Sequence, residues 1–165
     1  MKRNQSGFTL IEIAIVLVII GLLLGGVLKG QELINSAKVK NLTNDFKGVS
    51  TMIFSYQDKF HAVPGDDQAA STHLPAGAGT TTSPTNGDGN GVIAGAWDAA
   101  TGESFQFWQQ VRLAGLSQGA TDTAAADYAP HSTFGGRLGA TSSANGPITG
   151  MAGPFVVCAD NIPGK

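Results

Sequence analysis

The sequence predicts an α+β protein in which one long N-terminal helix packs on a small, loop-rich head with a short antiparallel sheet. Three features predict this fold: a continuous apolar run near the N-terminus, a periodic apolar stripe directly after it, and a C-terminal part rich in turn-forming residues. At 165 residues, the chain has room for one modest domain beyond the apolar run. The expected organisation is a leader at 1–7, a membrane-spanning half of the helix at 8–28, an amphipathic half at 29–61 and a head at 62–165.

The apolar run covers residues 8–28 and is interrupted by one carboxylate, that of Glu12. At about 1.5 Å per residue, a helix of this length reaches roughly 30 Å, the thickness of the hydrocarbon core of a bilayer. A carboxylate at mid-depth costs on the order of a few kcal/mol, and less near the end of the span, so acids in membrane segments usually have a function. Glu12 is therefore the first residue that needs an explanation.

Two ordinary interpretations explain this run less well. A secretory signal peptide has an apolar core of about 7–15 residues followed by a cleavage site with small residues. This run is longer, contains an acid, and has the bulky Ile34 at the best candidate cleavage site. A plain membrane anchor fits the length but gives no reason for Glu12 or for the Gly7-Phe8 pair.

The segment Gly7-Phe8-Thr9-Leu10-Ile11-Glu12, with the polar leader before it, resembles the N-terminus of type IV prepilins and of the related type II secretion pseudopilins. The resemblance implies a pilin-like fold, and it implies that prepilin peptidase cuts between Gly7 and Phe8 and methylates the new N-terminal Phe8. It further implies that Glu12 and Thr9 act in filament assembly. In a packed filament, the N-terminal ammonium of one subunit can meet the Glu12 carboxylate of a neighbour, and each charge then offsets the desolvation of the other.

The same resemblance implies a structural subunit and no enzyme. The chain would insert in the inner membrane as a single-pass precursor with its head in the periplasm, and would then join identical or homologous subunits in a type IV pilus or related filament. An inner-membrane assembly platform with a separate cytoplasmic ATPase would drive this step, because the sequence shows no nucleotide-binding motif. A type II secretion pseudopilin is the alternative within the class, and a membrane-tethered periplasmic binding or enzymatic domain is the alternative from another class.

An amphipathic stripe follows the apolar run. Its six apolar residues recur at spacings of three and four: Leu42, Phe46, Val49, Ile53, Tyr56 and Phe60. This is a one-sided stripe at about 3.5 residues per turn, which is typical of a helix packed on a core. The helix is expected to run from about Phe8 to Phe60 and to end before Pro64, because a proline disfavours helical backbone at the residue before it.

The head is expected to be irregular. Residues 61–100 are dense in turn formers and are predicted to be loop, whereas residues 104–116 are predicted to form a short amphipathic helix that ends near Gly115. The apolar face of that helix is expected to include Phe105, Trp108, either Val111 or Arg112, and Leu116. The strands are expected at residues 148–149, 154–158 and, less regularly, 132–138.

Charge and cysteine content limit the possible functions. Residues 61–165 hold three basic residues against eight acids, which argues against a nucleic-acid surface, because phosphate binding needs clustered Lys and Arg. The single cysteine, Cys158, excludes a disulfide within the chain, in contrast to the many type IV pilins that close a C-terminal loop this way. Cys158 is expected to be a buried structural thiol, unless a partner cysteine lies in a segment beyond the given C-terminus.

One segment of the head resembles a calcium-binding loop. In residues 86–91, oxygen-bearing side chains alternate with glycines, at Asn86, Asp88 and Asn90. An EF-hand would need Glu at the twelfth position, which is Trp97, so only a looser calcium (Ca²⁺) loop that adds Asp98 or Glu103 fits. The alternative is a plain turn, although some secretion pseudopilins do bind calcium in the head; no other cofactor is expected.

No arrangement of residues predicts an active site. The three histidines are scattered without metal-ligand spacing, and the sequence lacks the glycine-rich loops that hold phosphate or a nucleophilic serine. The carboxylate pair Asp66-Asp67 lies in a loop-like segment and is interpreted as a solvated turn, not as an acid/base pair.

Overall fold

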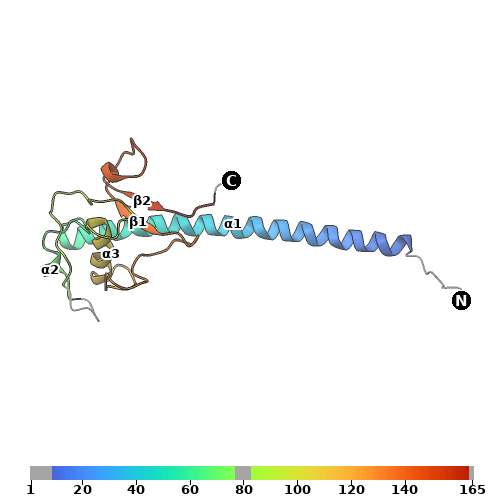
Figure 1. The fold of residues 1–165 in the computed structure, drawn as a ribbon, viewed down its shortest axis with the longest axis horizontal. Helices are drawn as coiled ribbons and strands as arrows, with labels where there is room; N and C mark the ends of the chain where they lie inside the picture. Colours follow the sequence, from blue (N-terminus) through green and yellow to red (C-terminus); the bar gives the residue numbers. More distant parts are fainter. Residues whose placement is uncertain (1–8, 77–82, 164–165) are drawn as a thin grey trace. The chain divides into compact units, whose positions relative to one another are not determined.

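The structure is a computed structural model that describes residues 9–76 and 83–163. Its elements in chain order are α1 (Leu10–Phe60), α2 (Ala70–His73), α3 (Glu103–Leu113), β1 (Leu138–Thr141), a 3-10 turn (Ser143–Asn145) and β2 (Val156–Ala159) (Figure 1). The predicted α+β class, with a long N-terminal helix, a small head and an antiparallel sheet, is confirmed. The chain divides into two compact units, Met1–Lys40 and Asn41–Lys165, which we describe separately.

The first unit contains the N-terminal part of α1, which is exposed almost throughout. The large apolar side chains between Leu10 and Leu28 have exposed fractions of 46% to 88%. This helix is long and apolar enough to cross a membrane, and none of its most apolar stretch is buried inside the protein. Such a surface needs lipid or another protein against it, because isolated soluble proteins rarely expose so much contiguous apolar area.

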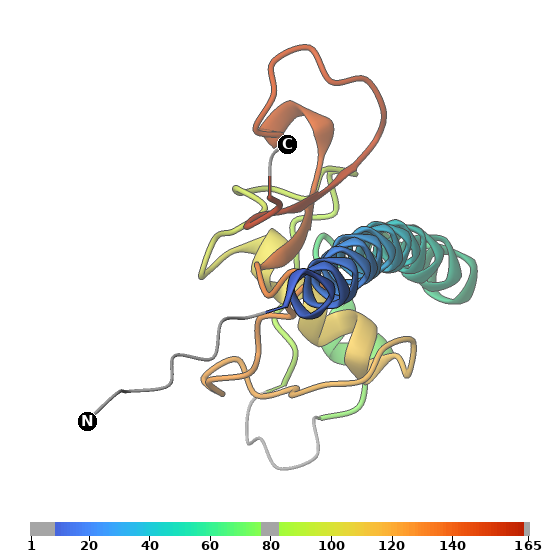
Figure 2. The same ribbon diagram turned by 90° about the vertical axis from the view of Figure 1, so that its right-hand side faces the viewer.

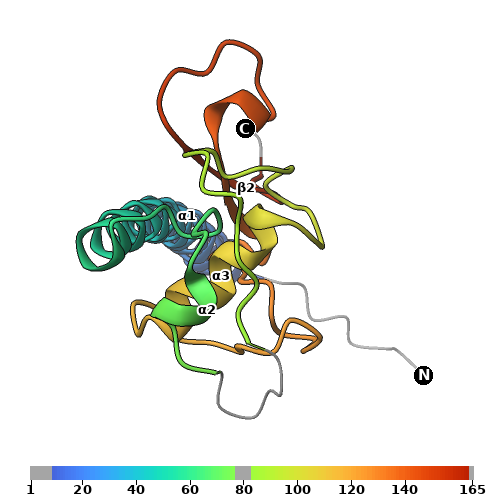
Figure 3. The ribbon, with the colours of Figure 1, turned by 90° about the vertical axis from the view of Figure 1, so that its left-hand side faces the viewer.

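The second unit, the head, is built on the C-terminal part of α1. Val49, Ile53 and Tyr56 are at most 1% exposed, and Leu42 is buried as well. The two remaining members of the predicted stripe, Phe46 and Phe60, are partly buried against the same core. The predicted stripe is therefore confirmed as the face of α1 that the head covers. Figures 2 and 3 show α3 between α2 and the strands of the head.

Helix α3 forms where it was predicted, and its buried face matches the prediction in part. Trp108 and Val111 are buried, as predicted. Phe107, which was not predicted, is fully buried, whereas the predicted core residue Phe105 is only partly buried. The ring of Phe105 instead packs against Tyr128, with ring centroids 4.5 Å apart. Because aromatic residues stand two positions apart in this helix, periodicity alone did not decide which of them faces the core.

The end of α3 follows the predicted glycine signal. Gly115 has a positive φ of 78°, which a residue without Cβ adopts at little cost. Its N–H donates to the carbonyl of Arg112 at 3.0 Å, and the N–H of Leu116 donates to the carbonyl of Val111 at 2.9 Å. This is the Schellman arrangement, which satisfies the last carbonyls of the helix and turns the chain away. The predicted helical residue Leu116 thus lies just beyond the helix.

The sheet consists of β1 and β2, which pair antiparallel with Leu138 opposite Ala159 and Thr141 opposite Val156. The predicted strand at residues 154–158 is confirmed in its second half. Cys158 lies in β2 and is half-buried, not fully buried as expected. Burial, together with the nearby carboxylate of Asp98, raises the pKa of this thiol.

Two strand predictions were wrong. Residues 148–149 lie in a turn, and the side chain of Ile148 is 65% exposed. Residues 132–138 contribute only Leu138, the first residue of β1, while an isolated bridge joins His131 to Arg137. β-branched residues favour a strand only where a neighbouring strand and a core offer contacts, and this turn has neither.

The described residues of the segment 61–100, which are 61–76 and 83–100, are mostly loop, as predicted, but they include the one-turn helix α2, which was missed. The sequence of α2, Ala-Ser-Thr-His, has no apolar periodicity that could have revealed it. A side chain outside α2 stabilises its first turn, because the N–H of Ser71 donates to Oδ1 of Asn86 at 2.8 Å.

We predict that Ile53→Ala lowers the free energy of unfolding of the head by about 2–5 kcal/mol, because it removes a fully buried side chain and leaves a cavity. The matched control is Ile34→Ala, the same change in the same helix at a side chain that is 57% exposed. Urea unfolding of the full-length chain in detergent, followed by tryptophan fluorescence, measures both. Equal effects of the two substitutions would contradict the assigned core.

Candidate functional site

The predicted processing residues Gly7 and Phe8 lie outside the described residues, so the N-terminal site is described from Thr9 onward. Thr9 directly precedes the first residue of α1, Leu10. It therefore holds the position that caps the N-terminus of the helix, and Glu12 holds the third helical position.

Thr9 and Glu12 form a reciprocal hydrogen-bonded pair. The backbone N–H of Thr9 donates to Oε2 of Glu12 at 2.8 Å, and the Thr9 hydroxyl donates to the same oxygen at 2.6 Å. In return, the N–H of Glu12 lies 3.4 Å from the Thr9 hydroxyl oxygen. This is a capping box, in which side chain and backbone at the start of a helix satisfy each other. The carboxylate also lies where the helix dipole favours negative charge.

The capping box gives the Glu12 carboxylate a hydrogen-bond partner in its own chain, Thr9, which the sequence did not lead us to predict. That interpretation assigned the Glu12 carboxylate only to the amine of a neighbouring subunit, although the pattern Thr9-x-x-Glu12 is itself a capping-box signature. No hydrogen bond from another described residue reaches Oε1 of Glu12. One oxygen of the carboxylate is thus held by its own helix, and the other, Oε1, which we call the open oxygen, has no hydrogen-bond donor among the described residues.

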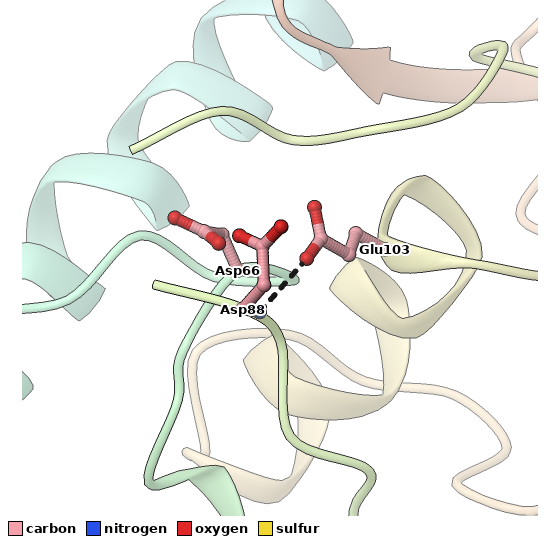
Figure 4. Close-up of side chains that lie close together, drawn as sticks. All are labelled: Asp66, Asp88 and Glu103. Atoms are coloured by element: carbon pink, nitrogen blue, oxygen red, sulfur yellow. Dashed lines mark hydrogen bonds between the residues drawn. The ribbon is translucent and has the colours of Figure 1, made fainter. Parts of the chain in front are cut away.

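A second candidate site lies in the head, where three carboxylates converge (Figure 4). Asp66 comes from the loop after α1, Asp88 from the loop at 86–91, and Glu103 is the first residue of α3. One oxygen of each lies within 4.8 Å of the others. None of the three takes part in the ion pairs found among the described residues. Like charges held this close repel unless a cation or a proton accompanies them.

Asp66 organises the glycine-rich loop around its own carboxylate. Its Oδ1 accepts hydrogen bonds from the N–H groups of Gly89 at 2.7 Å and Asn90 at 3.2 Å, and its Oδ2 accepts one from Gly91 at 2.6 Å. The approach is close, because a Cβ on Gly87 would lie 2.4 Å from the Asp66 backbone. The alternating glycines therefore let the loop wrap around a buried acid.

The interpretation of Asp66-Asp67 as a solvated turn was wrong. Asp66 is 3% exposed and Asp67 is 1% exposed. Each carboxylate is buried because backbone and side-chain donors surround it, a compensation that buried charge requires and that adjacent loop residues do not reveal in sequence.

The structure brings together only part of the predicted calcium loop. Asp88 and Glu103 meet, and the N–H of Asp88 donates to Oε1 of Glu103 at 3.1 Å. The side-chain oxygens of Asn86 and Asn90 instead accept backbone N–H groups, those of Ser71 and Val92, each at 2.8 Å.

Of the residues predicted for the calcium loop, Asn90 and Asp98 are not members of the three-carboxylate cluster. Asn90 donates from its amide to Oδ2 of Asp88 at 2.7 Å and so orients that carboxylate. Asp98 is not among the three converging carboxylates, and Asp66, which is among them, was not predicted. The cluster can hold a hard cation, since calcium prefers six to eight oxygen ligands and carboxylates are the strongest of these in proteins.

Asp67 ties α1 to α2 through a hydrogen-bond network centred on its buried carboxylate. Its Oδ2 accepts the hydroxyl of Tyr56 at 2.7 Å and lies 2.8 Å from Nδ1 of His73, while its Oδ1 accepts the N–H of Ala69 at 2.8 Å. Burial acts to raise the pKa of Asp67, but the hydrogen bonds from His73, Tyr56 and Ala69 outweigh it, so the pKa lies below its ordinary value. Burial, reinforced by Asp67, raises the pKa of Tyr56. The ring of His73 also stacks on Phe60 at 5.2 Å.

Comparison with known proteins identifies the N-terminal segment. The family model described as the prokaryotic N-terminal methylation motif matches residues 2–28. Neither the comparison with curated proteins nor that with solved structures gave a match. Together with the long apolar helix and the small α+β head, the motif supports a type IV pilin-like family for this chain. More narrowly, it supports a pilin-like or pseudopilin substrate of prepilin peptidase, and the apolar helix fits a membrane-anchored protein of that kind.

We predict that Asp67→Asn lowers the free energy of unfolding at pH 7 by about 1–3 kcal/mol, because buried donors lose a charged acceptor. The pKa of Asp67 is lower in the folded state than in the unfolded chain. The carboxylate therefore stabilises the head above the ordinary pKa of an aspartate, about 3.9, and this stabilisation is lost as the pH falls through the folded-state pKa.

The measurement is urea unfolding of wild type and variant from pH 7 downward. The difference between them should shrink on the acid side, and a difference that stays constant across that range would contradict the assignment. Asp58→Asn, at an exposed position of α1, is the control and should change little.

Proposed function

We propose that this chain is a prepilin-type structural subunit, cut between Gly7 and Phe8, methylated on Phe8 and assembled through its N-terminal helix into a type IV pilus or related filament. The observation that carries the proposal is the methylation-motif match at residues 2–28, which covers an exposed apolar run whose single acid is Glu12. The role is structural: the residues described here contribute surfaces and charge pairs, and the peptidase supplies the chemistry of processing.

The proposal includes a membrane stage and a filament stage. In the first, the precursor spans the inner membrane with its head in the periplasm, and the hydrogen bonds from Thr9 lower the cost of the Glu12 carboxylate in lipid. In the second, an assembly platform with a cytoplasmic ATPase adds the subunit to the filament. The N-terminal ammonium of a neighbouring Phe8 then pairs with the open oxygen of Glu12, and removal of either charge would leave the other unpaired in an apolar environment.

We predict that Gly7→Ala blocks cleavage and that Glu12→Ala permits cleavage but reduces filament yield by at least about tenfold, since an unpaired buried charge costs roughly 3–5 kcal/mol. The mass of the N-terminal peptide reports cleavage and methylation, and sheared surface filaments report assembly. The matched controls are Gly21→Ala, at a glycine with open space around it, and Glu32→Ala, at an exposed acid of the same helix. A wild-type protein that still begins at Met1, or normal filaments from Glu12→Ala, would contradict the proposal.

We further propose that the cluster of Asp66, Asp88 and Glu103 binds calcium. Three carboxylates converge, and none of them joins the ion pairs found in the part of the chain that the structure describes, which supports this proposal. Asn90 and the Asp66-centred loop hold the ligands in place. Calcium binding would favour the alternative of a type II secretion pseudopilin, because some members of that group bind calcium in the head. A membrane-tethered periplasmic binding domain would instead show an unprocessed N-terminus.

Calcium at millimolar concentration should raise the melting temperature of the head by several degrees, since a ligand at about 100 times its Kd stabilises by about 2.7 kcal/mol. Asp88→Asn and Glu103→Gln should abolish the rise, whereas Asp98→Asn should keep it. Differential scanning fluorimetry of the full-length chain in detergent, with magnesium as the reference cation, measures the shift. An unchanged melting temperature of the wild type would contradict the calcium site.

A further inference from the structure

The head contains a cleft of about 530 Å³ at the C-terminal end of α1. The cleft is lined by the last turn of α1, by the turns that follow this helix, by His73 of α2, and by Gly89 and Gly91 of the glycine-rich loop. All of these residues belong to one compact unit, Asn41–Lys165. The volume lies within the range of about 300–1,000 Å³ that is typical of small-molecule sites.

His73 offers this cleft a hydrogen-bond acceptor. Its Nδ1 lies 2.8 Å from Oδ2 of Asp67. Despite its burial, Asp67 has a pKa below its ordinary value, because His73, Tyr56 and Ala69 donate hydrogen bonds to it, so this carboxylate is ionised and can only accept. In the neutral imidazole the proton is therefore on Nδ1, and Nε2 keeps its lone pair. No hydrogen bond to Nε2 is found among the described residues, and the side chain is 32% exposed.

The fixed charges along the cleft are negative. Asp66 and Asp67 both line it, and the groups that donate to Asp66 are uncharged backbone N–H groups. None of the described residues that line the cleft is Lys or Arg. The C-terminal end of α1 carries a partial negative charge that adds to the same field. Charges that are buried in the protein act on a nearby ligand more strongly than charges in water, so the cleft favours a cation over an anion.

The cleft also has an apolar wall. Phe60, Ala62 and Val63 line it and are partly buried against the core of the head. The ammonium group of Lys59 lies 4.9 Å from the centroid of the Phe60 ring, but it donates to the carbonyl of Ala114 at 3.2 Å, and neither residue lines the cleft. The apolar wall can therefore contact a carbon chain, while the negative charges remain available to a ligand.

We propose that this cleft binds a small alkylammonium ion, which donates a hydrogen bond to Nε2 of His73 and lays its carbon chain against Phe60 and Val63. An ammonium group has three donors and no acceptor, which suits an acceptor nitrogen in a negative field. An alcohol of the same length would keep the hydrogen bond but lose the attraction between charges, and a carboxylate would lose both. The inference goes beyond the proposed structural role and does not depend on processing or assembly.

The cleft and the three-carboxylate cluster are neighbouring but different sites. Asp66 belongs to both, whereas Asp88 and Glu103 do not line the cleft and His73 is not a member of the cluster. A metal ion at the cluster would weaken the negative field that favours an ammonium ion. The ligand is therefore tested in buffer that contains EDTA, so that no metal ion occupies the cluster.

The test is isothermal titration calorimetry of the full-length chain in non-ionic detergent. The probe is cadaverine, a five-carbon diamine, and the matched compounds are 1,5-pentanediol and glutarate, which have chains of the same length without positive charge. The buffer is held at about pH 8, where an ordinary imidazole is neutral. Cadaverine should bind, and the diol and glutarate should bind at least about tenfold more weakly, because hydrogen bonds from charged donors are the stronger ones.

Two kinds of variant locate the site. His73→Asn keeps an amide N–H for Asp67 but removes Nε2, and it should weaken cadaverine binding at least about tenfold. His131→Asn, at an exposed histidine outside the cleft, is the matched control and should bind as the wild type does. Gln57 lines the cleft, so Gln57→Lys should weaken binding at least about tenfold and Gln57→Glu should strengthen it about threefold. This second pair tests the proposal even if His73→Asn does not fold.

Four results would overturn the proposal: no binding of cadaverine to the wild type, equal binding of the three compounds, equal binding by the two Gln57 variants, or wild-type affinity in a folded His73→Asn variant. Binding that appears only when calcium is added would also overturn it, because the ligand would then belong to the carboxylate cluster. Failure of the proposed function would instead appear as a missing methyl-Phe8 or missing filaments, and it would leave these affinities unchanged.

Discussion

The hydrogen-bonded pair of Thr9 and Glu12 is the interaction on which the account depends. A helix that starts inside or beside a bilayer has unsatisfied N–H groups in its first turn, and hydrocarbon offers them no partner. A carboxylate in the same place is costly for the same reason. The capping box satisfies both groups within one chain, because the Glu12 carboxylate accepts the N–H of Thr9 and the N–H of Glu12 reaches the Thr9 hydroxyl. In the proposed membrane stage, Thr9 would therefore satisfy the Glu12 carboxylate until the amine of a neighbouring subunit reaches it, and Oε1 would be available for that amine.

The head uses buried carboxylates in a comparable way. Its described residues form one sheet of two short strands, so strand pairing cannot satisfy much of their backbone. Asp66 gathers three consecutive N–H groups of the glycine-rich loop, and Asp67 joins Tyr56 of α1 to His73 of α2. The carboxylates of Asp66 and Asp67 thus accept backbone N–H groups that strand pairing does not satisfy. A small, glycine-rich domain is thereby held together on the amphipathic half of a helix whose other half is exposed along its length.

Local signals in the sequence predicted the parts of the structure that depend on the spacing of apolar residues and on the residues that end helices. The stripe from Leu42 to Phe60 and the end of α3 at Gly115 follow from spacing and from glycine chemistry, and both were found. The strand expected at residues 148–149 was not, because strand formation depends on a neighbour that the sequence does not display. The same limit applies to the acidic cluster. Asp88 and Glu103 stood in a recognisable pattern, whereas Asp66 joins them only through the folding of a distant loop.

The most direct test of the central interaction is solid-state NMR of the full-length protein in lipid bilayers, with ¹³C in the Glu12 carboxyl group and ¹⁵N in the Thr9 amide. A short dipolar contact between these two nuclei before any filament has formed is the result that the account predicts. Absence of this contact in a helix that still begins at Leu10 would contradict it, because the Glu12 carboxylate would then lie in the membrane without its hydrogen bond to Thr9.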